Sequence, residues 1–144
     1  MVLSRACKYA MQAVIYLARH NAAPVLSRRI AEELGIPQHF LAKILQDLTR
    51  RGLLQSFKGR GGGFQLARSA SAIRLLDVVE AIDGREFIDG CVLGLPECST
   101  ESACLVHSQW SLIKARIMTM LGEKSLDELI EDPLGNPWLE SIPD

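Results

Sequence analysis

The stretch SRRIAEELGIPQHFLAKILQDLTRR, residues 27–51, predicts a short helix, a turn and a longer amphipathic helix. Ser27 is a candidate N-cap, and Gly35 stands where helices often end in the left-handed conformation. Pro37 suits the first turn of the next helix, which carries one apolar face formed by Phe40, Leu41, Ile44, Leu45 and Leu48. This is the pattern of a helix-turn-helix, although an ordinary helical hairpin shares it.

The next stretch, LLQSFKGRGGGFQLAR, residues 53–68, predicts a β-hairpin. Strands are expected at 54–57 and 64–66, with Lys58 and Arg60 among the glycines of the tip. A basic, glycine-rich hairpin directly after a recognition helix is typical of the wing of a winged helix-turn-helix. A nucleotide phosphate loop is excluded, because GRGGG lies between two strands and lacks the GK[ST] ending.

Three further helices complete a mainly α fold with one small β-hairpin wing. The first is expected over residues 4–20 with Ser4 as its N-cap, the second from near Ser71 to Gly84, and the third over residues 105–121. Ile73, Leu76, Val79 and Ile82 would form the apolar stripe of the second. We therefore expect a DNA-binding domain at 1–70, a linker helix, cysteine loop and dimerisation helix at 71–131, and a flexible tail, ordered only in part, at 132–144.

Charge divides the chain close to the first of these boundaries. Residues 1–76 carry a net charge of +9 and residues 77–144 a net charge of −10, within a total of −1. A basic half indicates a polyanionic partner, and nucleic acid is the usual one. Solvated faces that segregate by chance are the alternative explanation.

The geometry of a helix-turn-helix on duplex DNA assigns expected roles to the polar residues. The N-terminal part of the third helix would read bases through Gln38, His39 and Lys43. Phosphate contacts are expected from Ser27, Arg28, Arg50 and Arg51, and minor-groove contacts from Lys58 and Arg60.

Other classes of protein find little support in the sequence. Charged residues interrupt the apolar N-terminal segment, so no membrane-spanning run and no signal peptide are expected, and the expected location is the cytoplasm. We expect no enzyme and no small-molecule substrate, because no nucleotide loop, catalytic carboxylate pair or second cofactor motif is found.

Residues 90–107, GCVLGLPECSTESACLVH, hold Cys91, Cys98, Cys104 and His107. Four explanations are open: an iron–sulfur cluster, a Cys₃His zinc site, a thiol–disulfide switch, or ordinary buried cysteines. Burial is disfavoured by the polar, glycine-containing loop, and a thiol switch leaves one cysteine without a role. The cysteine gaps are wider than the usual zinc spacing, which favours the bulkier cluster. Cys104 and His107 stand three residues apart at the start of a helix, where both can point the same way.

The long helix carries a repeating apolar seam. Its residues are separated by four, three, four and three positions, which resembles a coiled coil: Val106, Trp110, Ile113, Ile117 and Met120. Such a stripe can be intrachain core, but few other elements remain to cover it. A second subunit is the expected cover.

Together the wing KGRGGGF, the three-cysteine loop and the long helix resemble the IscR/NsrR family of bacterial winged-helix regulators, from the first helix to about residue 130. The resemblance implies a homodimer on palindromic promoter DNA and a 2Fe–2S or 4Fe–4S cluster on Cys91, Cys98 and Cys104. His107 matches the histidine ligand of IscR-like members. In NsrR-like members the fourth ligand is an acidic residue of the partner's first helix, and Lys8 stands at that position here.

This chain departs from the family pattern at two positions, Cys7 and Ala42. Cys7 could serve as a fourth thiolate, although packing as a small hydrophobe is favoured, and Ala42 replaces an acidic residue of the IscR-like recognition helix.

The implied function is a transcriptional regulator, expected to repress, that senses iron or cluster status, redox stress or nitric oxide. The alternatives are a winged-helix regulator with zinc or a thiol switch and, less favoured, an iron–sulfur enzyme.

Overall fold

The computed structural model describes residues 3–96, 99–101, 103–131 and 135–142. The elements are, in chain order, α1 (Arg5–Arg19), α2 (Ser27–Leu34), α3 (Gln38–Arg50), β1 (Leu54–Phe57), β2 (Gly63–Leu66), a 3₁₀ turn η1 (Ala70–Ala72), α4 (Leu75–Asp83), α5 (Glu86–Asp89), α6 (His107–Glu123), α7 (Leu126–Ile130) and α8 (Pro137–Ser141). The mainly α architecture with one hairpin is as predicted. None of the described helices combines the length and apolar character needed to cross a membrane.

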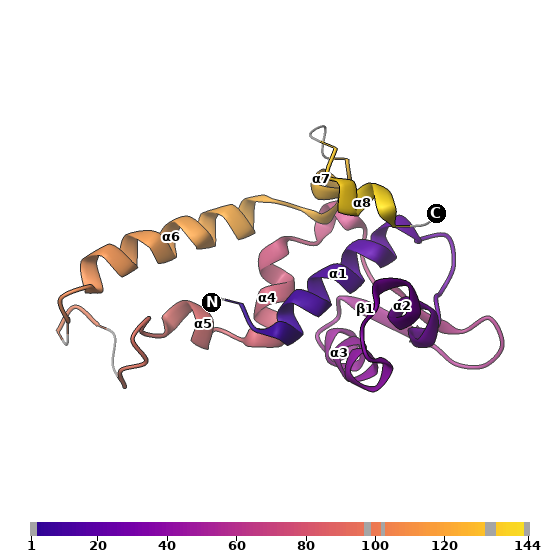
Figure 1. Cartoon of the computed structure of the whole chain (residues 1–144), viewed down its shortest axis with the longest axis horizontal. Coiled ribbons are helices and arrows are strands. Elements are labelled where there is room, and N and C mark those ends of the chain that lie inside the picture. The colour runs from indigo at the N-terminus through magenta and orange to yellow at the C-terminus, as the bar shows by residue number, and fades with distance from the viewer. Residues whose placement is uncertain (1–2, 97–98, 102, 132–134, 143–144) are drawn as a thin grey trace.

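Helix α1 is the central element of the core. It packs against α2, α3, α4, α7 and β2 (Figure 1). The side chain of Ser4 accepts a hydrogen bond from the backbone N–H of Cys7 at 3.0 Å, which confirms Ser4 as the N-cap. Tyr16 and Leu17 of α1 meet Leu41 and Leu45 of α3 in one buried cluster, so α3 is anchored along its apolar face.

The helix-turn-helix geometry is confirmed with two small corrections. Gly35 ends α2 at φ 67°, in the left-handed region that favours glycine. Ser27 is the first helical residue and not the N-cap, which is Leu26, because the pairing of Val25 with Phe64 holds the chain extended up to that point. Pro37 is likewise the N-cap of α3 rather than a residue of its first turn.

The wing is an antiparallel hairpin in which Leu54 pairs with Leu66 and Phe57 with Gly63. Its base is fixed to the domain by two hydrogen bonds between the backbones of Val25 and Phe64, at 2.9 and 2.8 Å. Gly63 has φ 135°, and a Cβ placed on it would lie 2.3 Å from the Val25 carbonyl oxygen. Only glycine therefore allows this close approach.

The linker helix begins later than the sequence predicts. Residues 70–72 form η1, Ile73 is extended and fully buried, and α4 starts at Leu75. The cause is a tertiary hydrogen bond, since the Leu126 N–H donates to the Ile73 carbonyl at 3.0 Å and holds that residue outside the helix. Gly84, at φ 68°, ends α4 as expected.

Helix α6 extends away from the winged domain beside α4, and its N-terminal half reaches the loop that follows α5 (Figure 1). It begins at His107, so the predicted start at Leu105 is wrong, and Leu105 is 98 % exposed. Within the tail, α8 buries Leu139, and Ile142 is buried just after it. The guanidinium of Arg19 donates a hydrogen bond to the Leu139 carbonyl, which fastens α8 to the end of α1.

Candidate nucleic-acid interface and cysteine site

The surface of α3 turned away from the core is polar along its length. Gln38, His39 and Lys43, the expected base readers, are all exposed. Gln46 and Arg50 continue the same face, because positions 39, 43, 46 and 50 fall at helical spacing. Gln46 was not among the residues predicted from the sequence, although helical spacing from His39 and Lys43 would have placed it on this exposed face.

Two of the expected phosphate-binding arginines pair with carboxylates on their own helices. Arg28 Nε lies 3.1 Å from Glu32 Oε1, with side chains 74 % and 65 % exposed, and Arg50 pairs with Asp47. Exposed pairs of this kind contribute little to stability, about 1 kcal/mol or less. Both guanidinium groups can therefore exchange these partners for a phosphate at low cost.

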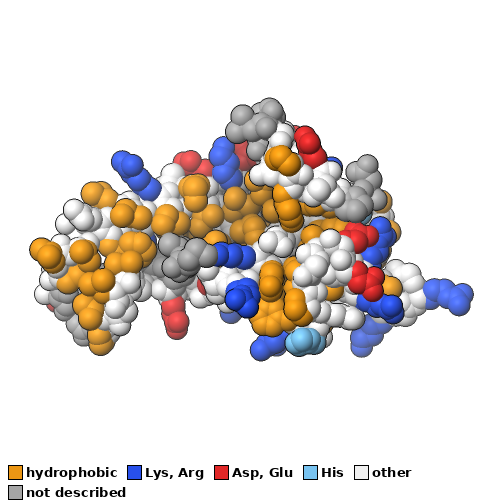
Figure 2. Space-filling view, viewed as in Figure 1, with side chains coloured by type: hydrophobic (Ala, Val, Ile, Leu, Met, Phe, Trp, Pro, Cys, Tyr) orange, Lys and Arg blue, Asp and Glu red, His pale blue; other side chains and the backbone are white. Residues whose placement is uncertain are grey.

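The remaining expected contacts lie around α2 and the hairpin. Ser27 is half-buried at the start of α2, Arg51 is exposed directly after α3, and Lys58 and Arg60 are exposed at the wing tip. Lys and Arg side chains gather at the end of the molecule that carries α2, α3 and the hairpin (Figure 2). The structure thus brings the expected DNA contacts onto one basic end.

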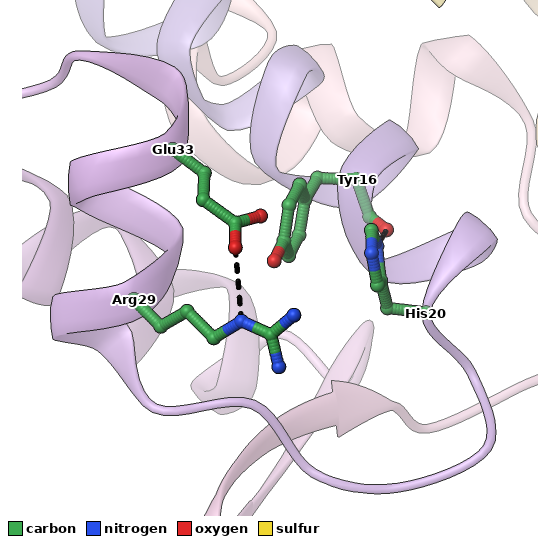
Figure 3. Close-up of polar contacts among 4 residues, drawn as sticks. All are labelled: Tyr16, His20, Arg29 and Glu33. Carbon is green, nitrogen blue, oxygen red and sulfur yellow. Dashed lines mark hydrogen bonds and ion pairs between the residues drawn. The ribbon is translucent and has the colours of Figure 1, made fainter. Parts of the chain in front are cut away.

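Four side chains lie where α2 approaches the C-terminal half of α1 (Figure 3). Arg29 Nε donates to Glu33 Oε1 at 3.0 Å, and the Tyr16 ring stacks on His20 with centroids 4.1 Å apart. Burial, followed by the neighbouring Glu33 carboxylate, raises the pKa of Tyr16 to about 12. The Tyr16 hydroxyl points toward Glu33 (Figure 3) but forms no hydrogen bond with any described residue.

The described part of the cysteine loop ends against the start of α6. Cys91 and Cys104 are half-buried and form no disulfide with another described residue. His107 is the first residue of α6, and its backbone N–H donates to the Cys104 carbonyl at 3.1 Å. Its Nε2 lies 3.4 Å from the hydroxyl oxygen of Ser111, one turn along the helix.

A second contact ties the other end of the loop to the same helix. The indole Nε1 of Trp110 donates to the Gly90 carbonyl at 3.0 Å. Gly90 precedes Cys91, and Trp110 follows His107 by three residues. Both ends of the loop therefore lie beside the first turns of α6. The end that carries Cys91 is close to the end that carries Cys104 and His107.

The described donors of this loop, two thiols and an imidazole, are of the types that ligate iron–sulfur clusters. The Leu93 N–H donates to Cys91 Sγ at 3.4 Å, and hydrogen bonds to sulfur tune such clusters. An imidazole that ligates metal usually has its other ring nitrogen hydrogen-bonded, as Ser111 allows for His107. Cys98 lies outside the described residues, and among those described no three metal-ligating side chains gather.

Cys7 belongs to the core and not to this loop. It is fully buried in a small cluster with Val79 and Leu121. Burial, with a further contribution from Asp83, raises the pKa of the Cys7 thiol to about 12. Its packing as a small hydrophobe, as favoured from the sequence, is confirmed.

The predicted seam of α6 divides between two faces. Trp110 and Ile117 are half-buried against their own chain, and Val106 is the partly buried N-cap. Ile113 and Met120 are 51 % and 56 % exposed, and Leu112, which the seam did not include, is 69 % exposed. A shallow hollow on this exposed side is lined by Leu112, Ala115, Arg116, Thr119, Met120, Glu123 and Lys124. Sequence spacing could not separate these faces, because both are apolar.

Comparisons with known proteins agree with this geometry. The Rrf2 family profile, described as iron-dependent transcriptional regulators, matches residues 3–132. The transcriptional regulator IscR of Xenorhabdus nematophila is 33 % identical over 133 residues, which cover 92 % of this chain and 80 % of that protein. The solved structure of T. potens IscR aligns with a TM-score of 0.75 at 26 % identity, over 90 % of this chain and 86 % of that one. The structure of CymR, the global cysteine regulator of B. subtilis, aligns with a TM-score of 0.76 at 23 % identity, over 88 % and 94 % of the two chains.

Proposed function

Since the chain belongs to the Rrf2 family of transcriptional regulators, we propose that it binds promoter DNA as a homodimer and that an iron–sulfur cluster controls this binding. The cluster would be held by Cys91, Cys98, Cys104 and His107. The observation that carries the proposal is the closure of the cysteine loop onto α6 by the Trp110–Gly90 hydrogen bond. This contact supports a ligand set assembled from both ends of one loop.

On DNA, α3 would enter the major groove and present Gln38, His39 and Lys43 to base edges. Lys58 and Arg60 would follow into the minor groove, where the negative potential is strongest. The phosphates on either side of the major groove would be contacted by Ser27, Arg28, Arg50 and Arg51. All of these side chains except the half-buried Ser27 are exposed, and they belong to the basic end of the molecule, which supports that assignment.

The second subunit would pack on the exposed apolar face of α6. Leu112, Ile113 and Met120 are apolar, at least half exposed, and belong to the longest helix of the described chain. A two-fold pair of such helices would place two recognition helices on the half-sites of a palindrome. The half-buried Trp110 and Ile117 would instead support the helix from its own side.

The cysteine loop would influence DNA binding through α4, which precedes α5 and the loop and is hydrogen-bonded to the start of α1. Asp83, the last residue of α4, accepts hydrogen bonds from the backbone N–H and the hydroxyl of Ser4, the N-cap of α1. Helix α1 in turn contacts the start of α3, where the Tyr9 and Phe40 rings meet edge to face at 5.7 Å. When bound, a cluster supplies a group that responds to oxidants, iron supply or nitric oxide, and the order of this loop would then bias the placement of α3.

A second candidate is a regulator of the same fold whose cysteines bind zinc or act as a thiol switch. It is supported by the half-buried thiols of Cys91 and Cys104, which can react or ligate without iron. Metal content separates it from the first candidate.

The experiment is to compare Cys91→Ala with Cys7→Ala and the unmodified protein, all purified without oxygen. The proposal expects Cys91→Ala to be colourless with altered affinity for a promoter duplex, while Cys7→Ala keeps its colour. A Cys91→Ala protein with unchanged colour and DNA affinity would contradict it.

A further inference from the structure

An open groove runs between the C-terminal half of α3 and the β-hairpin. It has a volume of about 320 Å³ and is lined by Gln46, Thr49, Arg50, Ser56 and Phe64. Three of the five residues come from α3 and two from the hairpin, one on each strand. None of the five except Arg50 has a role in the DNA contacts described above.

The position of this groove determines what can occupy it. If α3 lies in the major groove and the wing in the minor groove, one sugar–phosphate strand separates the two and must cross the space between the elements. We propose that the groove seats this strand, with Gln46 and Ser56 as sequence-independent donors to a phosphate. The inference rests on the DNA-binding function proposed above and adds a site to it.

The lining suits a phosphodiester. The Gln46 amide and the Ser56 hydroxyl are donors, and Arg50 adds a positive charge that is paired with the half-buried Asp47 carboxylate. The Thr49 hydroxyl donates to the Leu45 carbonyl of its own helix at 2.7 Å, so its hydrogen is already used and is not offered to the phosphate. No carboxylate is among the described residues that line the groove.

The groove has a rigid apolar wall on its hairpin side. Phe64 is half-buried, and its backbone is paired both with Ser56 across the hairpin and with Val25 at the base. A deoxyribose ring presents an apolar face of suitable size to such a wall. The groove thus offers donors for the phosphate and an apolar surface for the sugar.

A role in reading bases is disfavoured for Gln46 by its place on the helix. Gln38 and His39 occupy the first turn of α3, and Gln46 lies two turns further along, level with Thr49, Arg50 and the wing. In a helix that presents its N-terminal part to the bases, the C-terminal half faces the backbone. Contacts to the backbone position the protein and carry no direct sequence information.

The test measures dissociation constants of the full-length protein for two duplexes of about 30 base pairs, one selected from a random pool and one of scrambled sequence. The variants are Gln46→Ala, Ser56→Ala and Ser56→Asp, with Gln55→Ala as the matched control. Gln55 is exposed on the same strand as Ser56, and successive strand residues face opposite sides.

We expect Gln46→Ala and Ser56→Ala each to weaken binding to both duplexes by the same factor, about 10-fold for one hydrogen bond to a charged group. Ser56→Asp should abolish detectable binding, and Gln55→Ala should stay within about twofold. Thermal midpoints close to that of the unmodified protein would show that the variants fold.

Two results would overturn the inference. One is binding by Gln46→Ala and Ser56→Ala as tight as by Gln55→Ala. The other is a weakening by Gln46→Ala confined to the selected duplex, which would make Gln46 a base reader. Failure of the unmodified protein to bind either duplex would instead refute the DNA-binding function on which the site depends.

Discussion

The indole N–H of Trp110 and the carbonyl oxygen of Gly90 are joined by a hydrogen bond of 3.0 Å, which ties the residue before Cys91 to the first turns of α6. This contact closes the cysteine loop between α5 and the proposed dimer helix α6. It also gives a half-buried tryptophan on α6 a partner within its own chain.

Trp110→Phe removes this hydrogen bond and keeps most of the apolar packing. The variant should bind the cluster but release it faster in air, by several-fold, because the Cys91 end of the loop is no longer held at α6. The decay of visible absorbance after exposure to air measures the rate. Trp138→Phe, at an exposed tryptophan of α8, is the control and should decay like the unmodified protein. Equal decay of all three would contradict a role for the hydrogen bond.

Gly63→Ala should destabilise the winged domain. The residue has φ 135°, and a new Cβ would lie 2.3 Å from the Val25 carbonyl oxygen. The loss in free energy of unfolding should be about 3 kcal/mol or more, because the pairing of Val25 with Phe64 has to break. Gly61→Ala is the control, since it carries a positive φ of 75° but meets no atom within 4 Å; it should cost roughly 1 kcal/mol. Urea unfolding followed by circular dichroism measures both, and similar losses would refute the steric explanation.

Cys7 makes stability fall at alkaline pH. Its thiol has a pKa of 9.0 when unperturbed and about 12 in the folded chain, so between these values the unfolded chain releases a proton that the folded chain keeps. The neutral Cys7 thiol therefore makes its full contribution to the free energy of unfolding below pH 9.0. This contribution disappears as the pH rises toward 12. Between about pH 8 and about pH 10.5 the unmodified protein should lose about 2 kcal/mol more than Cys7→Ala. Parallel curves for the two proteins would show that the thiol is not desolvated.

Replacement of the wing cations tests the electrostatic part of DNA binding. Lys58→Ala and Arg60→Ala should each reduce the slope of log K against log salt concentration by about 1, because each removes a cation that neutralises one phosphate. Titrations at several salt concentrations measure the slope. Arg85→Ala, at an exposed arginine between α4 and α5, is the control and should leave the slope unchanged. Unchanged slopes for the wing variants would exclude the wing from the interface.

Leu112→Glu tests the dimer face of α6. The side chain is 69 % exposed, so the chain should fold normally, while a carboxylate buried against a second subunit should shift the protein to monomer. Sedimentation velocity at micromolar concentration distinguishes the two states. Gln55→Glu introduces the same charge on the exposed wing and should stay dimeric. A dimeric Leu112→Glu protein would place the interface elsewhere.

Local signals in the sequence predicted most of the winged domain. Gly35, the apolar face of α3 and the glycines of the hairpin act within a few residues, so the helix-turn-helix and the wing could be placed. The start of α4 could not, because a hydrogen bond from Leu126, far along the chain, keeps Ile73 extended.

The two faces of α6 could likewise not be distinguished from local sequence. Trp110 and Leu112 are both apolar, and only the tertiary fold decides that Trp110 turns toward Gly90 while Leu112 remains exposed. The cysteine spacing predicted a ligand loop, and the structure adds how its ends are held. Cys98 lies outside the described residues, so its role stays a prediction from the sequence.

The central claim is the iron–sulfur cluster, and its most direct test is an absorption spectrum with iron and acid-labile sulfide analysis on protein purified without oxygen. The account predicts a coloured protein with matched iron and sulfide, and the absence of both from Cys91→Ala. A colourless protein that contains zinc, or no metal after attempted reconstitution, would contradict it and leave a winged-helix regulator with a structural or thiol-switch cysteine site.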